Sequence, residues 1–199
     1  MSSAVGIAFL QVGEDVKAFT HMAAGGLFAL QAIPFIAASP GKATFLLGGG
    51  IIGSLLPDID HPSSSFGRRV LPVSLLLSAT FGHRGITHSL FAVVAITLLV
   101  WFGLAQTGGY PDFVNPLAIG LSLGYLSHLF ADYFTNSGVP LLWPNKRKFA
   151  FFFTLKTGSV SEYVLAFVLY VVLYRNIVEV VNISPFLPGL NAGVSRSIR

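Results

Sequence analysis

The stretch HSLFAVVAITLLVWFGLAQ, residues 88 to 106, carries no Asp, Glu, Lys or Arg and is close to the length that crosses a lipid bilayer. A hydrocarbon core of about 30 Å takes roughly 20 helical residues to span. Further apolar stretches cover about residues 22–38, 43–56, 113–134 and 160–181. Pro40 and Gly41 favour a tight hairpin between the first two of these. The sequence therefore predicts an all-α, polytopic membrane protein with about four to five transmembrane helices.

The composition agrees with a membrane protein. Of 199 residues, 53 % are hydrophobic and only 10 % are charged, with a mean hydropathy of +0.73. Cysteine is absent, so any bound metal must be held by oxygen and nitrogen atoms. The net charge of +4 is better explained by membrane topology and anionic lipid head groups than by nucleic acid, which we do not expect as a partner. No repeat or shift in composition divides the chain, so we expect one domain over residues 1–199.

Polar residues gather at one end of the expected helices. His21 precedes the first helix, the motif LPDIDHP follows the second, HRGITHS introduces the third, and HLFAD lies near the end of the fourth. Consecutive helices run in opposite directions, so all of these segments fall at the same membrane face. The residues concerned are His21, Asp58, Asp60, His61, His83, Arg84, His88, His128 and Asp132.

The spacing of these residues is typical of metal ligands. His128 and Asp132 are four apart and share one face of a helix. Pro57 and Pro62 favour an extended or turning backbone from which Asp58 and Asp60 would point the same way. Carboxylates beside apolar spans are costly and usually mark a functional site. We therefore expect a metal site formed from Asp58, Asp60, His61, His83, His88, His128 and Asp132.

Each residue also has a structural interpretation. Asp60 could cap a helix, His128 could be a buried hydrogen-bonded histidine, and Thr87 or Ser89 could cap the third helix. Arg84 could anchor the chain at the membrane interface or clamp an anionic group of a substrate. The number of carboxylates and imidazoles at one face favours the functional interpretation for the set as a whole.

The basic residues indicate the orientation of this face. Most of them flank the polar side: Lys17, Arg68, Arg69, Arg84, Lys146, Arg147, Lys148 and Lys156. The positive-inside rule therefore predicts that the polar face is cytoplasmic. The apolar segment VLPVSLLLSATF, from Val70, lies on the same side and is too short to span, so we expect it to be interfacial or re-entrant.

The motifs LPDIDHP, HRGITHS and GYLSHLFADYFTNSGVPLLWP resemble those of a family of membrane-bound predicted metal-dependent hydrolases, the LexA-regulated inner-membrane hydrolase type. The resemblance covers about residues 21–162 and includes the upstream histidine. It implies a small helical protein of the inner (plasma) membrane with a hydrolase activity that is itself inferred from ligand-like residues. The family's polar positions match His21, Asp58, Asp60, His61, His83, His88, His128 and Asp132, and its later acidic position matches Glu162 less closely.

Mixed carboxylate and imidazole ligands suit Zn²⁺, Mn²⁺ or Fe²⁺, and the number of candidate groups would serve two ions as well as one. A bound metal would activate water for attack on an acyl or phosphoryl group. A residue that is not a ligand, one of His21, His83 or Asp60, would act as general acid or base.

The position at the membrane surface favours a lipid or lipid-linked ester or phosphoester as substrate. Arg84, with Lys146 or Arg147, would steer its anionic head group. Two other classes of protein stay open, a divalent-metal transporter and a membrane protein whose metal is purely structural. Transporters usually place their ligands near the bilayer midplane, whereas these residues gather at one end.

Overall fold

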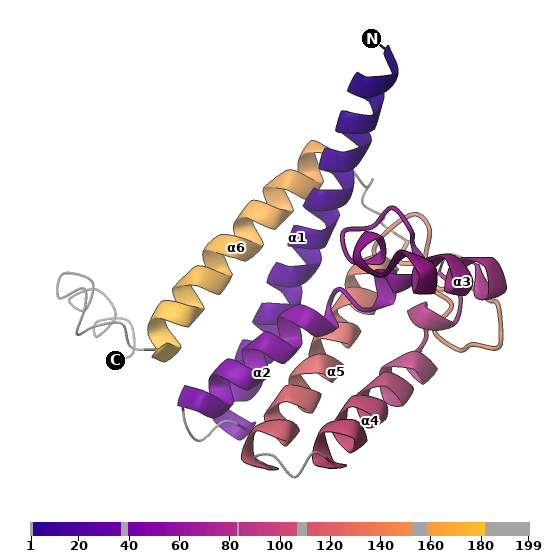
Figure 1. Cartoon of the computed structure of the whole chain (residues 1–199). Helices are drawn as coiled ribbons and strands as arrows, with labels where there is room; N and C mark the ends of the chain where they lie inside the picture. Colours follow the sequence, from indigo (N-terminus) through magenta and orange to yellow (C-terminus); the bar gives the residue numbers. More distant parts are fainter. Residues whose placement is uncertain (1, 37–39, 83, 107–110, 153–158, 182–199) are drawn as a thin grey trace.

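The protein is a bundle of helices (Figure 1). The computed structural model describes residues 2–36, 40–82, 84–106, 111–152 and 159–181. Its α-helices are α1 (Ser2–Ile36), α2 (Pro40–Gly53), α3 (Leu71–Phe81), α4 (Leu90–Gln106), α5 (Pro111–Tyr133) and α6 (Val160–Val181). Short 3₁₀ helices η1 (Pro57–Asp60), η2 (Gly67–Val70) and η3 (Ile86–His88) connect them. Within the described ranges no β-strand is present, so the all-α prediction is confirmed.

Four segments are long and apolar enough to cross a membrane: Ala18–Ile36, Gly41–Asp60, Phe113–Tyr133 and Val160–Val178. Helix α4 is apolar but shorter, with 17 residues. That length lies at the lower limit of about 17 residues for a transmembrane helix. The expectation of four to five spans therefore agrees with the structure.

Helix α5 lies at the centre, in contact with α1, α2 and α4 (Figure 1). Its contact with α2 depends on glycines. A Cβ atom on Gly120 or Gly124 would overlap backbone atoms of α2, and one on Gly53 would overlap the backbone of Leu121 in α5. Small residues allow helix backbones to approach closely in membranes, where dispersion contacts replace the hydrophobic effect as the main attraction. This close approach holds the end of α2 against the middle of α5, about two turns before His128.

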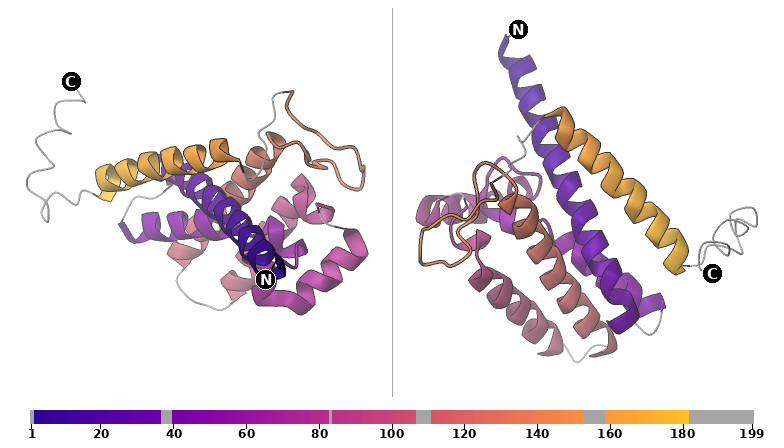
Figure 2. Two further views of the ribbon diagram at one scale, coloured as in Figure 1. Left: turned by 90° about the horizontal axis from the view of Figure 1, so that it is seen from above. Right: turned by 180° about the vertical axis from the view of Figure 1, so that it is seen from behind.

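Two helices lie at the edge of the bundle. Helix α6 runs beside α1 (Figures 1 and 2), where Leu173 packs with Ala23 and Leu30, and most of its other side chains are exposed. Helix α3 has only 11 residues and contacts η1 and η2. Several of its apolar side chains, including Leu75 and Leu76, are exposed. A short, exposed, apolar helix agrees with the expectation of a segment that does not span.

One helix boundary differs clearly from the expectation. Helix α1 begins at Ser2, so His21 lies inside this helix and does not precede it. The apolar span does begin near this residue, at Ala18. The segment before it contains no proline, so the helix can continue past the end of the apolar stretch. Hydropathy therefore located the span but not the helix.

Candidate metal centre

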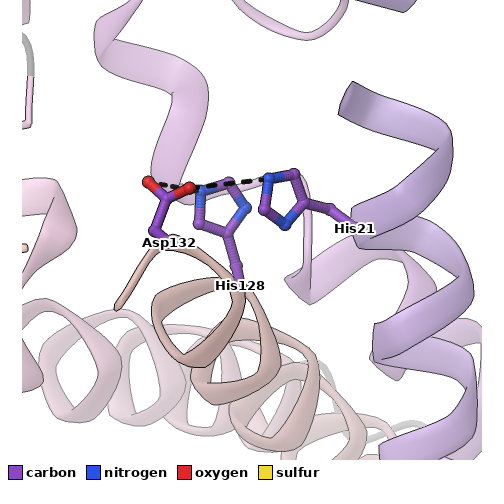
Figure 3. A group of neighbouring side chains, drawn as sticks. All are labelled: His21, His128 and Asp132. Carbon is purple, nitrogen blue, oxygen red and sulfur yellow. Dashed lines mark ion pairs between the residues drawn. The ribbon is translucent and has the colours of Figure 1, made fainter. Parts of the chain in front are cut away.

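Four segments of the chain bring imidazoles and carboxylates together. His128 and Asp132 lie in the last turns of α5, Asp58 in η1 after α2, and His88 in η3 before α4. His21 comes from α1, and its ring points toward His128 and Asp132 (Figure 3). The relative exposure is 0 % for His88, 1 % for His128 and 2 % for Asp132. The expected convergence of these segments is therefore present, and it is buried.

Four donor atoms form a closed ring. Nε2 of His88 lies 3.6 Å from Oδ1 of Asp58 and 3.6 Å from Oδ2 of Asp132. Nε2 of His128 lies 3.7 Å and 3.8 Å from the same two oxygens. Metal bonds of about 2.1 Å in a tetrahedron place neighbouring ligand atoms about 3.4 Å apart. These four of the six edges of such a tetrahedron are therefore only slightly longer than a tetrahedral ion requires, and the ring could hold a metal.

The orientation of His128 is set by the backbone. Its Nδ1 lies 2.7 Å from the carbonyl oxygen of Ser54. A carbonyl oxygen only accepts hydrogen bonds, so Nδ1 must carry the proton and Nε2 the lone pair. Nε2 is buried and has no hydrogen-bond partner among the described residues. Buried polar atoms nearly always have a bonding partner, and a metal ion bound at Nε2 would supply the partner that this nitrogen lacks.

His88 is oriented by side chains on its other nitrogen. Nδ1 lies 3.1 Å from Oγ1 of Thr87 and 3.5 Å from Oδ2 of Asp60, and the Thr87 hydroxyl donates to that same oxygen. A carboxylate behind the second nitrogen is the usual support of a metal-binding histidine. Burial lowers the pKa of His88, but the neighbouring carboxylates of Asp58, Asp60 and Asp132 outweigh this effect and raise the pKa to about 9. The surroundings therefore favour positive charge at this position.

His21 extends the cluster. Its ring stacks on that of His128, with centroids 3.8 Å apart and planes 19° apart, and its Nε2 lies 3.8 Å from Oδ1 of Asp132. Two groups of residues thus have the spacing of metal ligands, His21 with His128 and Asp132, and Asp58 with His88 and His128. The lone pairs of a histidine lie in its ring plane, so nearly parallel stacked rings aim poorly at one shared ion. The second group, joined by Asp132, is the better ligand set.

Asp58 and Asp60 do not point the same way, contrary to our expectation. The backbone forms the 3₁₀ turn η1, and the two carboxylates lie on opposite sides of the His88 ring. Asp58 faces Nε2, whereas Asp60 faces Nδ1 and accepts a hydrogen bond from the backbone N–H of Arg84. The structure therefore gives Asp60 a supporting position and places it in neither ligand group.

Arg84 is not the interfacial anchor that one interpretation expected, and its role as a clamp on an anionic substrate group stays a prediction. Its side chain turns inward, and NH2 lies 2.9 Å from Oδ2 of Asp132. NH1 donates to Oγ1 of Thr135 and to the carbonyl oxygen of Gly138. The residue has a φ of 58°, which is uncommon outside glycine. It is therefore a fixed partner of the cluster, with its guanidinium held beside Asp132.

The remaining expected residues lie elsewhere. His61 is in neither ligand group, and its Nδ1 lies 3.0 Å from Oγ of Ser63. His83 lies outside the described residues. Lys146 and Arg147 are exposed in the segment after α5, and Glu162 is buried in the first turn of α6. Ser89 caps α4 through a hydrogen bond from the N–H of Ala92, as one structural interpretation had proposed.

Supporting residues escaped the sequence interpretation. Thr87 joins Asp60 to His88, and the Tyr125 hydroxyl donates to the Thr87 carbonyl oxygen at 2.6 Å. Tyr125 could have been found, because it lies three residues before His128 and seven before Asp132, on the same helix face. The Ser54 carbonyl could not, because its role depends on the contact between α2 and α5.

The fold and the cluster together define a multi-pass helical membrane protein with buried histidines and aspartates that could hold a metal ion. The family model described as YdjM inner membrane protein matches residues 16–188, and the chain belongs to this family. Family membership and the apolar helices indicate a multi-pass protein of the inner membrane.

Individual relatives match smaller parts of the chain. Inner membrane protein YdjM of Escherichia coli is 50 % identical over 100 residues, which cover 50 % of this chain and 49 % of the relative. The protein YvsG of Bacillus subtilis is 38 % identical over 113 residues, covering 57 % of this chain and 66 % of the relative. The chain thus spans about half the length of the Escherichia coli relative. No solved structure matches the chain.

Proposed function

We propose that this protein is a membrane-embedded, metal-dependent hydrolase that cleaves an ester or phosphoester of a lipid or lipid-linked substrate. The observation that carries the proposal is the ring of four donor atoms from Asp58, His88, His128 and Asp132, with edges of 3.6 to 3.8 Å. Two imidazoles and two carboxylates suit Zn²⁺ or Mn²⁺. A divalent ion bound there supplies Lewis acidity, which activates water near neutral pH and stabilises negative charge on the reacting oxygen.

Residues around the four-atom ring would transfer protons and orient the ligands. His21 is buried against His128, and its Nδ1 has no hydrogen-bond partner among the described residues. It is therefore the best placed of the described imidazoles outside the four-atom ring to move a proton as general acid or base. Asp60 and Thr87 hold His88 in the orientation that presents its Nε2 to the other three donor atoms of the four-atom ring.

The substrate class follows from the position of the ring. It lies where α2 and α5 end and α4 begins, next to exposed basic residues: Arg68, Arg69, Lys146, Arg147 and Lys148. Basic residues near a membrane surface attract anionic lipid head groups, by about 1 kcal/mol each. By the positive-inside rule, the same residues support a cytoplasmic position for this face. A phospholipid or lipid-linked phosphate at that face would approach the ring from the side of Asp58, whose side chain is 25 % exposed.

The test is release of phosphate or head groups from a panel of phospholipids and lipid-linked phosphates by detergent-purified protein. We expect hydrolysis that a chelator abolishes and that Zn²⁺ or Mn²⁺ restores. Asp58→Asn and His128→Asn should lose both activity and bound metal. His61→Asn is the matched control, because His61 follows the same turn yet belongs to neither ligand group, so it should keep both.

Two outcomes would contradict the proposal. If hydrolysis is absent across the panel while vesicles show chelator-sensitive metal flux that the same variants abolish, the protein is a transporter. If metal removal only lowers the thermal stability, with neither hydrolysis nor flux, the metal is structural.

A further inference from the structure

The two groups of ligand-like residues share His128. One group joins it to His21 and Asp132, and the other joins it to Asp58 and His88. The Nδ1 of His128 is taken by its hydrogen bond to the Ser54 carbonyl oxygen, so only Nε2 can bind a metal. One nitrogen lone pair serves one ion. The groups therefore compete for His128 and do not form two independent sites.

A positive charge of the protein already lies beside the ring. NH2 of Arg84 is 2.9 Å from Oδ2 of Asp132, the oxygen that also faces His88 and His128. The guanidinium is fixed by Thr135 and Gly138, and the backbone N–H of Arg84 donates to Asp60. Its side chain is 14 % exposed, so water screens it little. The guanidinium of arginine is a permanent cation in proteins.

From these contacts we propose that the centre holds a single divalent ion and that the guanidinium of Arg84 takes the place of a second one. The inference rests on the proposed metal-dependent function and specifies its metal content. The carboxylates of Asp58, Asp60 and Asp132 are neutralised by one divalent ion together with Arg84. A second divalent ion would leave excess positive charge in a buried site, where charge is strongly penalised. Arg84 also offers a fixed donor beside the reacting group, as arginines do in phosphoryl transfer.

The first test is the metal content of the wild-type protein, which requires no variant. Elemental analysis of the detergent-purified protein, after saturation with Mn²⁺ or Zn²⁺ and removal of free ions, should give one ion per chain. The electron paramagnetic resonance spectrum of the Mn²⁺ form should be that of an isolated ion. Two ions per chain with a spin-coupled spectrum would overturn the inference and leave the proposed hydrolase intact. Absence of bound metal would overturn the proposed function, and the inference with it.

The second test removes the charge of Arg84. In Arg84→Gln, the repulsion between the guanidinium and the bound ion is lost, so we expect Mn²⁺ to bind roughly tenfold tighter or more, or a second ion to bind. Arg84→Lys keeps the charge and should stay close to the wild-type affinity and stoichiometry. A purely structural role of Arg84 predicts the opposite result, weaker binding in both variants. That result, measured on protein whose circular dichroism spectrum is unchanged, would overturn the proposed role of Arg84.

Discussion

Thr87 shows how one hydroxyl can link the ring to its surroundings. It donates to Asp60 and lies 3.1 Å from Nδ1 of His88, so it fixes the carboxylate and the imidazole together. Thr87→Val removes this hydroxyl and keeps the shape of the side chain. Loss of a supporting hydrogen bond typically lowers metal affinity about 10- to 100-fold, and we expect that loss here. Titration with Mn²⁺ measures it.

The control for Thr87→Val is Thr80→Val. The Thr80 hydroxyl is exposed, and within the part of the chain that the structure describes it bonds only to carbonyl oxygens of its own helix α3, so its removal should leave metal affinity unchanged. Equal loss of affinity in both variants would show that the effect of Thr87→Val is not specific to the ring.

The ion pair of Arg84 and Asp132 gives a prediction about stability. Asp132→Asn leaves the buried guanidinium without its carboxylate, and removal of one partner of a buried pair typically destabilises by about 3–5 kcal/mol. We therefore expect the metal-free variant in detergent to unfold at a lower temperature than the metal-free wild type. The double variant Arg84→Met with Asp132→Leu removes both charges and should recover most of the loss. If the double variant is as unstable as Asp132→Asn, an unpaired Arg84 is not the cause of the destabilisation.

The sequence predicted which residues come together better than how their side chains are oriented. The spacing of His128 and Asp132 was sufficient, because both residues lie on one helix. For Asp58 and Asp60 the flanking prolines indicated a turn, but the partners that separate the two carboxylates, Thr87 and the backbone of Arg84, come from a distant segment. Local sequence carries no information about those contacts.

At the scale of elements, the glycines between α2 and α5 position the ring. Gly53 immediately precedes Ser54, whose carbonyl oxygen accepts the hydrogen bond from His128. A Cβ atom at Gly53 would overlap the backbone of Leu121, which cannot move aside as a side chain could. In Gly53→Ala we therefore expect the helices to separate, with a loss of about 1–3 kcal/mol in the free energy of unfolding and weaker metal binding.

Gly48→Ala is the matched control for Gly53→Ala. Gly48 lies on the same helix, and a Cβ atom there would meet no other atom within 4 Å. Alanine is favoured over glycine inside a helix by about 1 kcal/mol, so this variant should be as stable as the wild type or more stable. Thermal unfolding measures the stability of both variants, and metal titration measures their affinity. Equal destabilisation would contradict the close approach of α2 and α5.

The elements were predictable where hydropathy alone defines them. The apolar stretches identified the helical spans, and Pro40 marks the start of α2. The hairpin expected around Pro40 and Gly41 stays a prediction, because residues 37–39 lie outside the described residues. The start of α1 at Ser2 and the 3₁₀ form of η1 were not predictable in this way. Hydropathy marks where a chain can lie in lipid, whereas helix ends depend on backbone hydrogen bonds and tertiary contacts.

For the whole molecule, orientation in the membrane decides which substrates the ring can meet. The segment after α5 carries Lys146, Arg147 and Lys148 and is tied to the cluster through the bond from Arg84 to Gly138. From the positive-inside rule we expect such a segment to lie in the cytoplasm. Green fluorescent protein fused after Trp143 should therefore fluoresce, and alkaline phosphatase fused at the same position should be inactive. A fusion after Gln106, at the opposite end of α4, should give the reverse pattern. Phosphatase activity from the Trp143 fusion, with none from the Gln106 fusion, would place the ring on the periplasmic face, where cytoplasmic lipid head groups cannot reach it.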